Sequence, residues 1–133
     1  MKEIQIKVRF CETDLAGHIN NTSYFIYLEE ARTSFFEHLL ENKEATKTNF
    51  ILASIKCDFV NQGFYKQPLS VKTSVSTIGS KSFSLDHEVI CSNTQQLIAK
   101  GNAVIVNFDY EQQKSVVLSE EMREILNGNL VYK

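Results

Sequence analysis

The sequence contains no tryptophan, one proline, five glycines and three cysteines among its 133 residues. So little proline and glycine excludes a collagen-like or proline-rich chain and argues against long disordered segments. No run of 18 apolar residues is present, so we expect no transmembrane helix and no membrane partner. The first residues alternate instead of forming the apolar block of a signal peptide. A cytoplasmic location is therefore the default expectation.

Neither sign of charge dominates. The net charge is −2 and the isoelectric point is about 5.9, so long-range attraction to nucleic acid is not expected. Hydrophobic residues make up 43% of the chain, which is ordinary for a globular protein. A chain of this length predicts one domain over residues 1–133, large enough for a proper core.

The three cysteines are odd in number and match no zinc-binding spacing: Cys11, Cys57 and Cys91. We interpret them as reduced, mostly buried, small apolar residues. Cys11 is the alternative nucleophile because it lies near His18, but no catalytic motif surrounds it. No two histidines have metal-ligand spacing, so we expect no metal and no cofactor.

The first half of the chain predicts one strand followed by one long helix. Apolar and polar residues alternate at the start, which is typical of a half-buried strand, and its apolar face would carry Ile4, Ile6, Val8 and Phe10. After a polar turn the apolar residues recur every three or four positions, as in an amphipathic helix. This pattern predicts a helix over Asn21–Leu40, which Asn42 could end, and then a polar connection over residues 41–49.

Period-two alternation then returns and predicts four more strands. Their apolar faces would carry four sets of side chains: Ala53, Ile55, Cys57 and Phe59; Leu69, Val71, Thr73 and Val75; Phe83, Leu85, His87 and Val89; and Leu97, Ala99, Gly101, Ala103 and Ile105. Short turns join the last three strands, which favours an antiparallel meander. A final short helix is predicted from Ser119, as its cap, to Leu126. The fold class is therefore α+β, with an antiparallel sheet of about five strands wrapped around one long helix.

Most of the unusual polar residues lie in the turn before the long helix. Asp14 and His18 precede a helix whose first N–H groups can bind an oxygen that becomes negative during acyl transfer. Asp14 could then act as the nucleophile or as the base that activates a water. The structural alternative is that these residues only cap the helix and shape the turn, with Gly17 supplying a positive φ.

A longer pattern surrounds this turn. From Arg9 to Arg32 the chain contains Glu12-Thr13-Asp14, Gly17-His18-Ile19-Asn20-Asn21, Tyr24 and Glu30-Ala31-Arg32. This stretch resembles the signature of the 4-hydroxybenzoyl-CoA thioesterase-like family, the hot-dog acyl-CoA thioesterases, in which a β-sheet wraps a central helix. The resemblance implies hydrolysis of an acyl-CoA thioester without a metal, in a homodimer or homotetramer whose active site lies at the subunit interface.

The resemblance also implies roles for individual residues. The family's catalytic aspartate matches Asp14, its carbonyl-polarising backbone N–H falls on Asn21, and its histidine matches His18. Tyr24 would line the acyl pocket. Gly17 and Asn20, between these residues, are expected to contact substrate as well.

Several further residues have competing interpretations. Lys81, with Ser82 beside it, lies in a turn and is the candidate to reach the phosphates of coenzyme A, while the other lysines are interpreted as a solvated face. His38, late in the helix, is expected to be structural. His87 is interpreted as a satisfied core or interface residue. Glu30 and Arg32 are interpreted as a structural ion pair or as interface contacts.

Three other functions remain open. A non-catalytic acyl-CoA binding module would be expected to lack the acid and to carry a DNA-binding domain. A hot-dog dehydratase would use an Asn-Pro motif, which is absent. An acyl carrier protein thioesterase has a similar loop, although an acidic surface suits an acidic carrier less well. Neither the acyl chain nor the choice between nucleophile and base at Asp14 follows from residue types.

Overall fold

The computed structural model describes residues 1–40 and 49–130. These residues form six strands, two α-helices and one short 3₁₀ helix. In chain order they are β1 (Lys2–Lys7), the 3₁₀ helix η1 (Phe10–Glu12), α1 (Asn21–Leu39), β2 (Phe50–Phe59), β3 (Pro68–Ile78), β4 (Ser82–Cys91), β5 (Leu97–Asp109), β6 (Lys114–Ser115) and α2 (Glu120–Asn127). None of the helices in the described ranges is long and apolar enough to cross a membrane.

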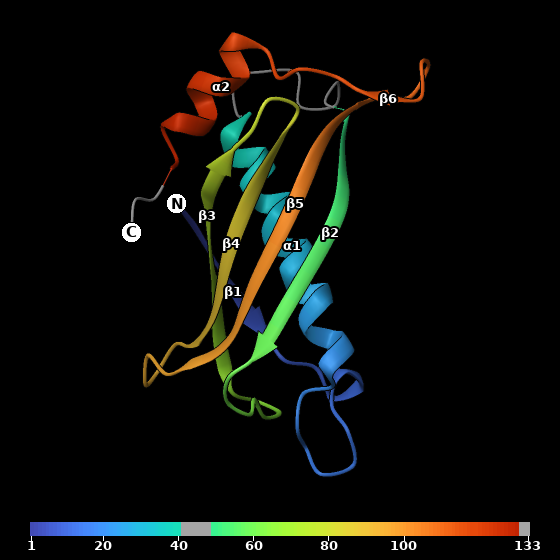
Figure 1. The fold of residues 1–133 in the computed structure, drawn as a ribbon. Helices are drawn as coiled ribbons and strands as arrows, with labels where there is room; N and C mark the ends of the chain where they lie inside the picture. The colour runs from blue at the N-terminus through green and yellow to red at the C-terminus, as the bar shows by residue number, and fades with distance from the viewer. Residues whose placement is uncertain (41–48, 131–133) are drawn as a thin grey trace.

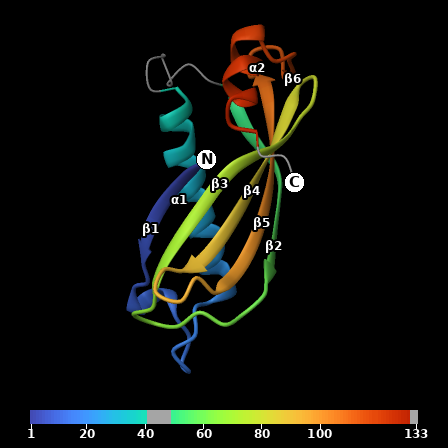
Figure 2. The same ribbon diagram turned by 90° about the vertical axis from the view of Figure 1, so that its left-hand side faces the viewer.

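The strands form one antiparallel sheet with the order β1-β3-β4-β5-β2, and β6 pairs with the end of β5. The sheet curves along α1, which lies against one of its faces (Figures 1 and 2). This architecture confirms the predicted α+β hot-dog fold. It also places the β1 and β2 strands at opposite edges of the sheet.

The core forms between α1 and the inward face of the sheet. On α1, Leu28 and Phe35 are fully buried, because they recur at helical spacing on the face toward the sheet. On the strands, alternate residues such as Val71, Leu85 and Ala103 are fully buried. Gly101 leaves room for the helix side chain above it, since a Cβ there would lie 2.7 Å from Leu28 Cδ1.

Three details of the predicted strands are wrong. The first strand stops at Lys7, and Phe10, predicted on its buried face, begins η1 and is 77% exposed. A β-bulge between Leu52 and Ser54 removes Ala53 from the regular alternation of β2. Bulges and strand ends depend on the partner strand, which a pattern within one segment does not reveal.

Both predicted helices are confirmed within one residue at each end. Helix α1 begins at Asn21 and ends at Leu39, with Leu40 as its C-cap. Asn42, considered as its end, lies outside the described residues. Helix α2 begins after Ser119, whose Oγ accepts a hydrogen bond of 3.1 Å from the Met122 N–H, as expected of an N-cap.

Candidate active site

The polar turn before α1 folds as a short hairpin. The Asp14 N–H donates to the His18 carbonyl at 2.8 Å, and the Gly17 N–H donates to the Asp14 carbonyl at 3.1 Å. Gly17 has φ +82°, so the turn uses the left-handed conformation that glycine adopts without strain. The hairpin is attached to the segment before β3, because the Tyr65 N–H donates to the Gly17 carbonyl at 2.9 Å.

The two oxygens of the Asp14 carboxylate have different surroundings. Oδ1 accepts hydrogen bonds from the Ala16 N–H at 2.9 Å and the His18 N–H at 3.0 Å. Oδ2 lies 3.8 Å from His18 Nδ1, and the Asp14 side chain is 44% exposed. Oδ1 is therefore held in place by the backbone, while Oδ2 accepts no hydrogen bond from any residue that the structure describes.

The start of α1 lies beside this carboxylate. Asn20 is the N-cap, but its side chain donates to the Thr13 carbonyl and does not cap the helix. The Asn21 N–H at the first helical position has no acceptor among the described residues. It is one of the N–H groups that a helix leaves unpaired at its positive end.

These groups meet at one cavity of about 230 Å³. Asp14, His18, Asn21 and Tyr24, all predicted from the sequence, line it. Gly17 and Asn20 do not line it and instead shape the hairpin and the start of the helix. The cavity therefore brings the Asp14 carboxylate together with the unpaired N–H of Asn21, and the His18 side chain also lines it.

The last residue of β2 and the loop that follows it form the other wall, which sequence analysis missed. The wall consists of Phe59, Asn61, Gln62 and Gly63. The Ile19 N–H donates to the Gly63 carbonyl at 2.9 Å, and the Phe64 ring packs 5.1 Å from the His18 ring. No local motif marks this loop in the sequence, because its place depends on the pairing of β2 and β3 with other strands.

Tyr24 joins the two walls. It is 3% exposed and its ring lies 5.4 Å from the Phe59 ring. Burial raises the pKa of Tyr24, and a hydrogen bond with the Gly63 backbone partly opposes this rise. Gly63 has no room for a side chain, since a Cβ there would lie 2.6 Å from the Tyr24 hydroxyl.

The two remaining predicted substrate residues lie elsewhere. Lys81 and Ser82 are at the turn between β3 and β4, next to α2 and at the opposite end of the sheet from Asp14 (Figure 1). Contacts with the C-terminal part of the chain hold this turn: the Leu118 N–H donates to the Ser80 carbonyl, and Arg123 donates to the Gly79 carbonyl. Lys81 and Ser82 of this chain therefore do not line the Asp14 cavity.

Several other predictions need correction. Cys91 is buried, but Cys57 is only half-buried and Cys11 is exposed in η1, outside the Asp14 cavity. Glu30 and Arg32 form no ion pair with each other, because Glu30 is exposed and Arg32 is buried without a salt bridge in the described parts of the chain. The alternative, that they make interface contacts, stays a prediction.

The other two histidines lie away from the cavity. His38 is exposed in the last turn of α1. His87 is buried in the core, as predicted, but among the described residues only its Nδ1 has a partner, Thr73 Oγ1 at 2.8 Å. Across residues 1–40 and 49–130, no three side chains of the His, Cys, Asp or Glu type are grouped so as to hold a metal.

Comparison with known proteins adds an independent observation. The sequence profile of the thioesterase-like superfamily matches residues 8–126. YsmA of Bacillus subtilis, a protein described as uncharacterized, is 34% identical over 123 residues, which cover 92% of this chain and 82% of YsmA. Long-chain acyl-CoA thioesterase FadM of Escherichia coli is 28% identical over 126 residues, which cover 93% of this chain and 96% of FadM.

A solved structure supports the same relationship. A predicted thioesterase from Bacillus stearothermophilus has a TM-score of 0.88 and 27% identity, with 98% of this chain and 97% of that chain covered. The match over residues 8–126 and this shared architecture show that the chain belongs to the thioesterase-like superfamily.

Proposed function

We propose that this protein hydrolyses acyl-coenzyme A thioesters, with Asp14 as its catalytic carboxylate. The observation that carries the proposal is the single cavity onto which both Asp14 and the unpaired N–H of Asn21 open. Acyl transfer needs an agent that attacks or activates water and a donor for the developing oxyanion. The similarity to FadM supports an acyl-CoA as the substrate class.

The surroundings of the carboxylate suggest which atom acts. Because Oδ1 accepts two backbone N–H groups, Oδ2 is the oxygen available to the substrate. Oδ2 either attacks the thioester carbonyl, expelling the thiolate and forming an anhydride that water then cleaves, or removes a proton from the attacking water. In both courses the Asn21 N–H stabilises the negative carbonyl oxygen. His18, with Nδ1 at 3.8 Å from Oδ2, orients the carboxylate or the water.

Substitution of Asp14 by Asn tests the proposal. The amide keeps the shape of the side chain but supplies neither a nucleophile nor a base, so kcat should fall by about 10³-fold, equal to about 4 kcal/mol of transition-state stabilisation. Thiol release from a panel of acyl-CoAs measures this, and calorimetry should still detect acyl-CoA binding. If binding persists but wild type releases no thiol, the protein is a non-catalytic acyl-CoA binding module.

Asp109 provides a matched control. Its Oδ1 accepts from the Glu111 and Gln112 N–H groups in an exposed turn, much as Asp14 Oδ1 accepts from its own loop. Asp109→Asn should therefore leave turnover unchanged. Substantial turnover by Asp14→Asn would instead assign the chemistry to another residue. After a single turnover in ¹⁸O-labelled water, label in the Asp14 carboxylate would demonstrate nucleophilic attack, because a water activated by general-base catalysis labels only the product acid.

The proposal includes a dimer formed through β2. On the described part of the chain β2 pairs only with β5, so its other edge is open. Exposed apolar side chains surround this edge: Leu52, Phe59 and Val60 on and after β2, and Phe25 and Ile26 at the start of α1. An open apolar edge favours pairing with another strand, and a second copy offers the same strand.

A two-fold axis through such a pairing would also explain the position of Lys81. Antiparallel pairing of the two β2 strands places the β3–β4 turn of one copy at the end of the sheet where the other copy carries Asp14. Lys81 of the second copy would then reach toward the phosphates of a coenzyme A bound at Asp14. In this arrangement each active site takes its carboxylate from one subunit and its cation from the other.

A further inference from the structure

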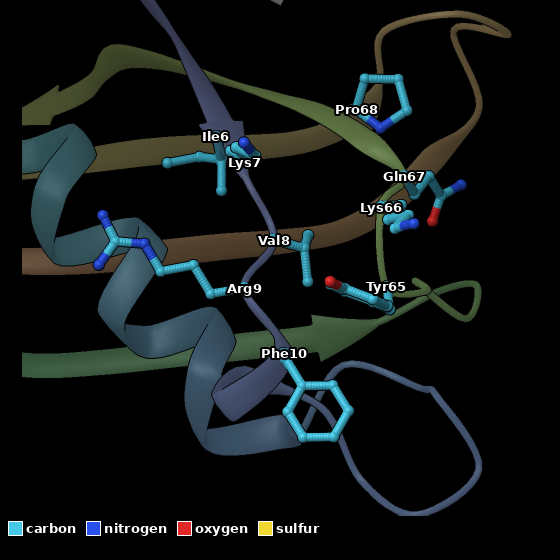
Figure 3. A pocket seen from close by; sticks show the side chains of 9 residues that line it. All are labelled: Ile6, Lys7, Val8, Arg9, Phe10, Tyr65, Lys66, Gln67 and Pro68. Atoms are coloured by element: carbon cyan, nitrogen blue, oxygen red, sulfur yellow. The ribbon is translucent and has the colours of Figure 1, made fainter.

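A second and larger cavity lies at the opposite edge of the sheet from β2. Its volume is about 550 Å³, and it lies between the end of β1 and the segment that leads into β3 (Figure 3). None of its lining residues also lines the Asp14 cavity. Because the open edge of β2 is on the far side of the sheet, a dimer through β2 would leave this cavity exposed.

The interior of this cavity is apolar. Ile6 and Val8 form its floor and are 7% and 2% exposed. The rings of Phe10 and Tyr65 lie 5.9 Å apart in an edge-to-face arrangement at its rim, and the Val8 side chain points toward Tyr65 (Figure 3). Phe10, which is exposed instead of lying on the buried face of a strand, thus lines this cavity. A ligand bound there would remove apolar surface from water.

The charges around the cavity are all positive. Lys7 and Lys66 flank it from β1 and from the opposite segment, and Lys66 Nζ lies 5.6 Å from the centre of the Tyr65 ring. No carboxylate lines the cavity, and neither lysine makes a salt bridge with any residue that the structure describes. Arg9 also lines it, but its side chain points toward α1 (Figure 3). Two unpaired ammonium groups beside apolar surface favour a ligand with one anionic end.

We propose that this cavity binds an organic carboxylate with an apolar body, of the size of a medium-chain fatty acid. The carboxylate would lie between Lys7 and Lys66, and the chain would lie over Val8, against the paired rings of Phe10 and Tyr65. The volume falls within the range of small-molecule sites. The site is independent of the proposed hydrolysis, because it shares no lining residue with the Asp14 cavity.

Titration with decanoate below its micellar concentration, followed by amide chemical shifts in ¹⁵N-labelled protein, tests this site. Saturable shifts are expected at residues 6–10 and 65–67, separate from any at residues 14–24 that report on the Asp14 cavity. Decanol, which has the same chain without the charge, should bind this site at least tenfold more weakly. Thiol release is measured separately, so failure of the proposed hydrolysis would not be mistaken for failure of this site.

A pair of double variants supplies the control. Lys7→Gln with Lys66→Gln should weaken decanoate binding at residues 6–10 at least tenfold. Lys2→Gln with Lys114→Gln removes the same charge from exposed or half-exposed positions outside the cavity and should leave the affinity unchanged. Equal affinities in the two double variants, equal binding of decanol, or shifts confined to residues 14–24 would overturn the proposal.

Discussion

At the scale of single residues, Glu12 connects three segments around the Asp14 hairpin. Its Oε1 accepts from the Arg9 N–H at 2.8 Å and from the Tyr27 hydroxyl at 2.9 Å. Its carbonyl accepts from the Asn20 N–H and from Ser23 Oγ, both at 2.9 Å. Burial, together with this carboxylate, raises the pKa of Tyr27, so the phenol stays protonated and donates. Glu12 therefore hydrogen-bonds both to the segment that follows β1 and to the first turns of α1, on the two sides of the hairpin.

Loss of these bonds should displace the carboxylate of Asp14. We expect Glu12→Ala to lower kcat by about tenfold and the free energy of unfolding by about 2 kcal/mol, because the Arg9 N–H and the hydroxyl of buried Tyr27 lose a charged acceptor. Glu12→Gln retains an acceptor oxygen and should recover most of the activity. Tyr27→Phe leaves the Arg9 bond in place and should have the smaller effect. Steady-state thiol release and denaturant unfolding measure both quantities, and full activity in Glu12→Ala would contradict a positioning role.

Buried His87 makes stability depend on pH. Burial, followed by the nearby charge of Arg32, lowers its pKa to about 3, and Asp86 partly opposes this. In the unfolded chain its pKa is about 6.5, so between these values the unfolded state binds the extra proton. The contribution of neutral His87 to the free energy of unfolding is therefore fully present above pH 6.5, and it is lost progressively as the pH falls toward 3.

The expected slope is up to about 1.4 kcal/mol per pH unit from this one group. His87→Gln cannot titrate, so its free energy of unfolding should fall less between pH 7 and pH 4 than that of wild type. Urea unfolding at a series of pH values measures the difference. Parallel curves for the two proteins would show that His87 is not the group responsible.

At the scale of elements, hydrophobic period predicted α1 and a cap residue marked the start of α2, and that cap can be tested directly. Ser119→Ala removes the oxygen that accepts the Met122 N–H and should lower the free energy of unfolding by about 1 kcal/mol. Ser119→Gly should cost only a few tenths of that amount, because glycine leaves the N–H groups open to water. Denaturant unfolding of both variants checks this order, and equal losses would contradict a capping role.

The strand predictions were right where burial follows from alternation within one segment. They were wrong where hydrogen bonds to another segment or a local turn change the backbone. Val71 and Leu85 are buried as their alternation predicts. The bulge at Ala53 arises because two residues of β2 oppose one position of β5. Phe10 leaves the strand because the Glu12 N–H donates to the Arg9 carbonyl and turns the chain into η1.

At the scale of the whole molecule, assembly through β2 predicts that the protein has at least the mass of a dimer in solution and that its activity falls when the dimer is disrupted. Light scattering at micromolar concentration should give at least twice the chain mass of 15.2 kDa. Leu52→Glu places a charge on the apolar β2 edge, so it should shift the protein toward monomer and lower thiol release together. Val117→Glu changes an apolar residue that is 56% exposed elsewhere and should alter neither. A monomeric wild type with full activity would contradict the shared site.

The sequence by itself determined the features that depend on local order. Asp14, His18 and Asn21 lie within eight consecutive positions, so a hairpin before a helix is enough to bring them together. Helical and strand periods likewise predicted α1, the sheet and their α+β arrangement, because burial of one face follows from spacing along the chain.

Only the tertiary structure decided the features that join distant segments. The wall formed by Phe59 and Gly63 reaches Asp14 because β2 ends and β3 begins at that end of the sheet. Lys81 was predicted to reach the coenzyme A phosphates because it is a lysine in a turn. It lies at the opposite end of the sheet from Asp14, because the 11-residue strand β3 separates the β3–β4 turn from the Asp14 end. The physical reason is that strand pairing sets which loops meet, and pairing depends on contacts between residues far apart in the sequence.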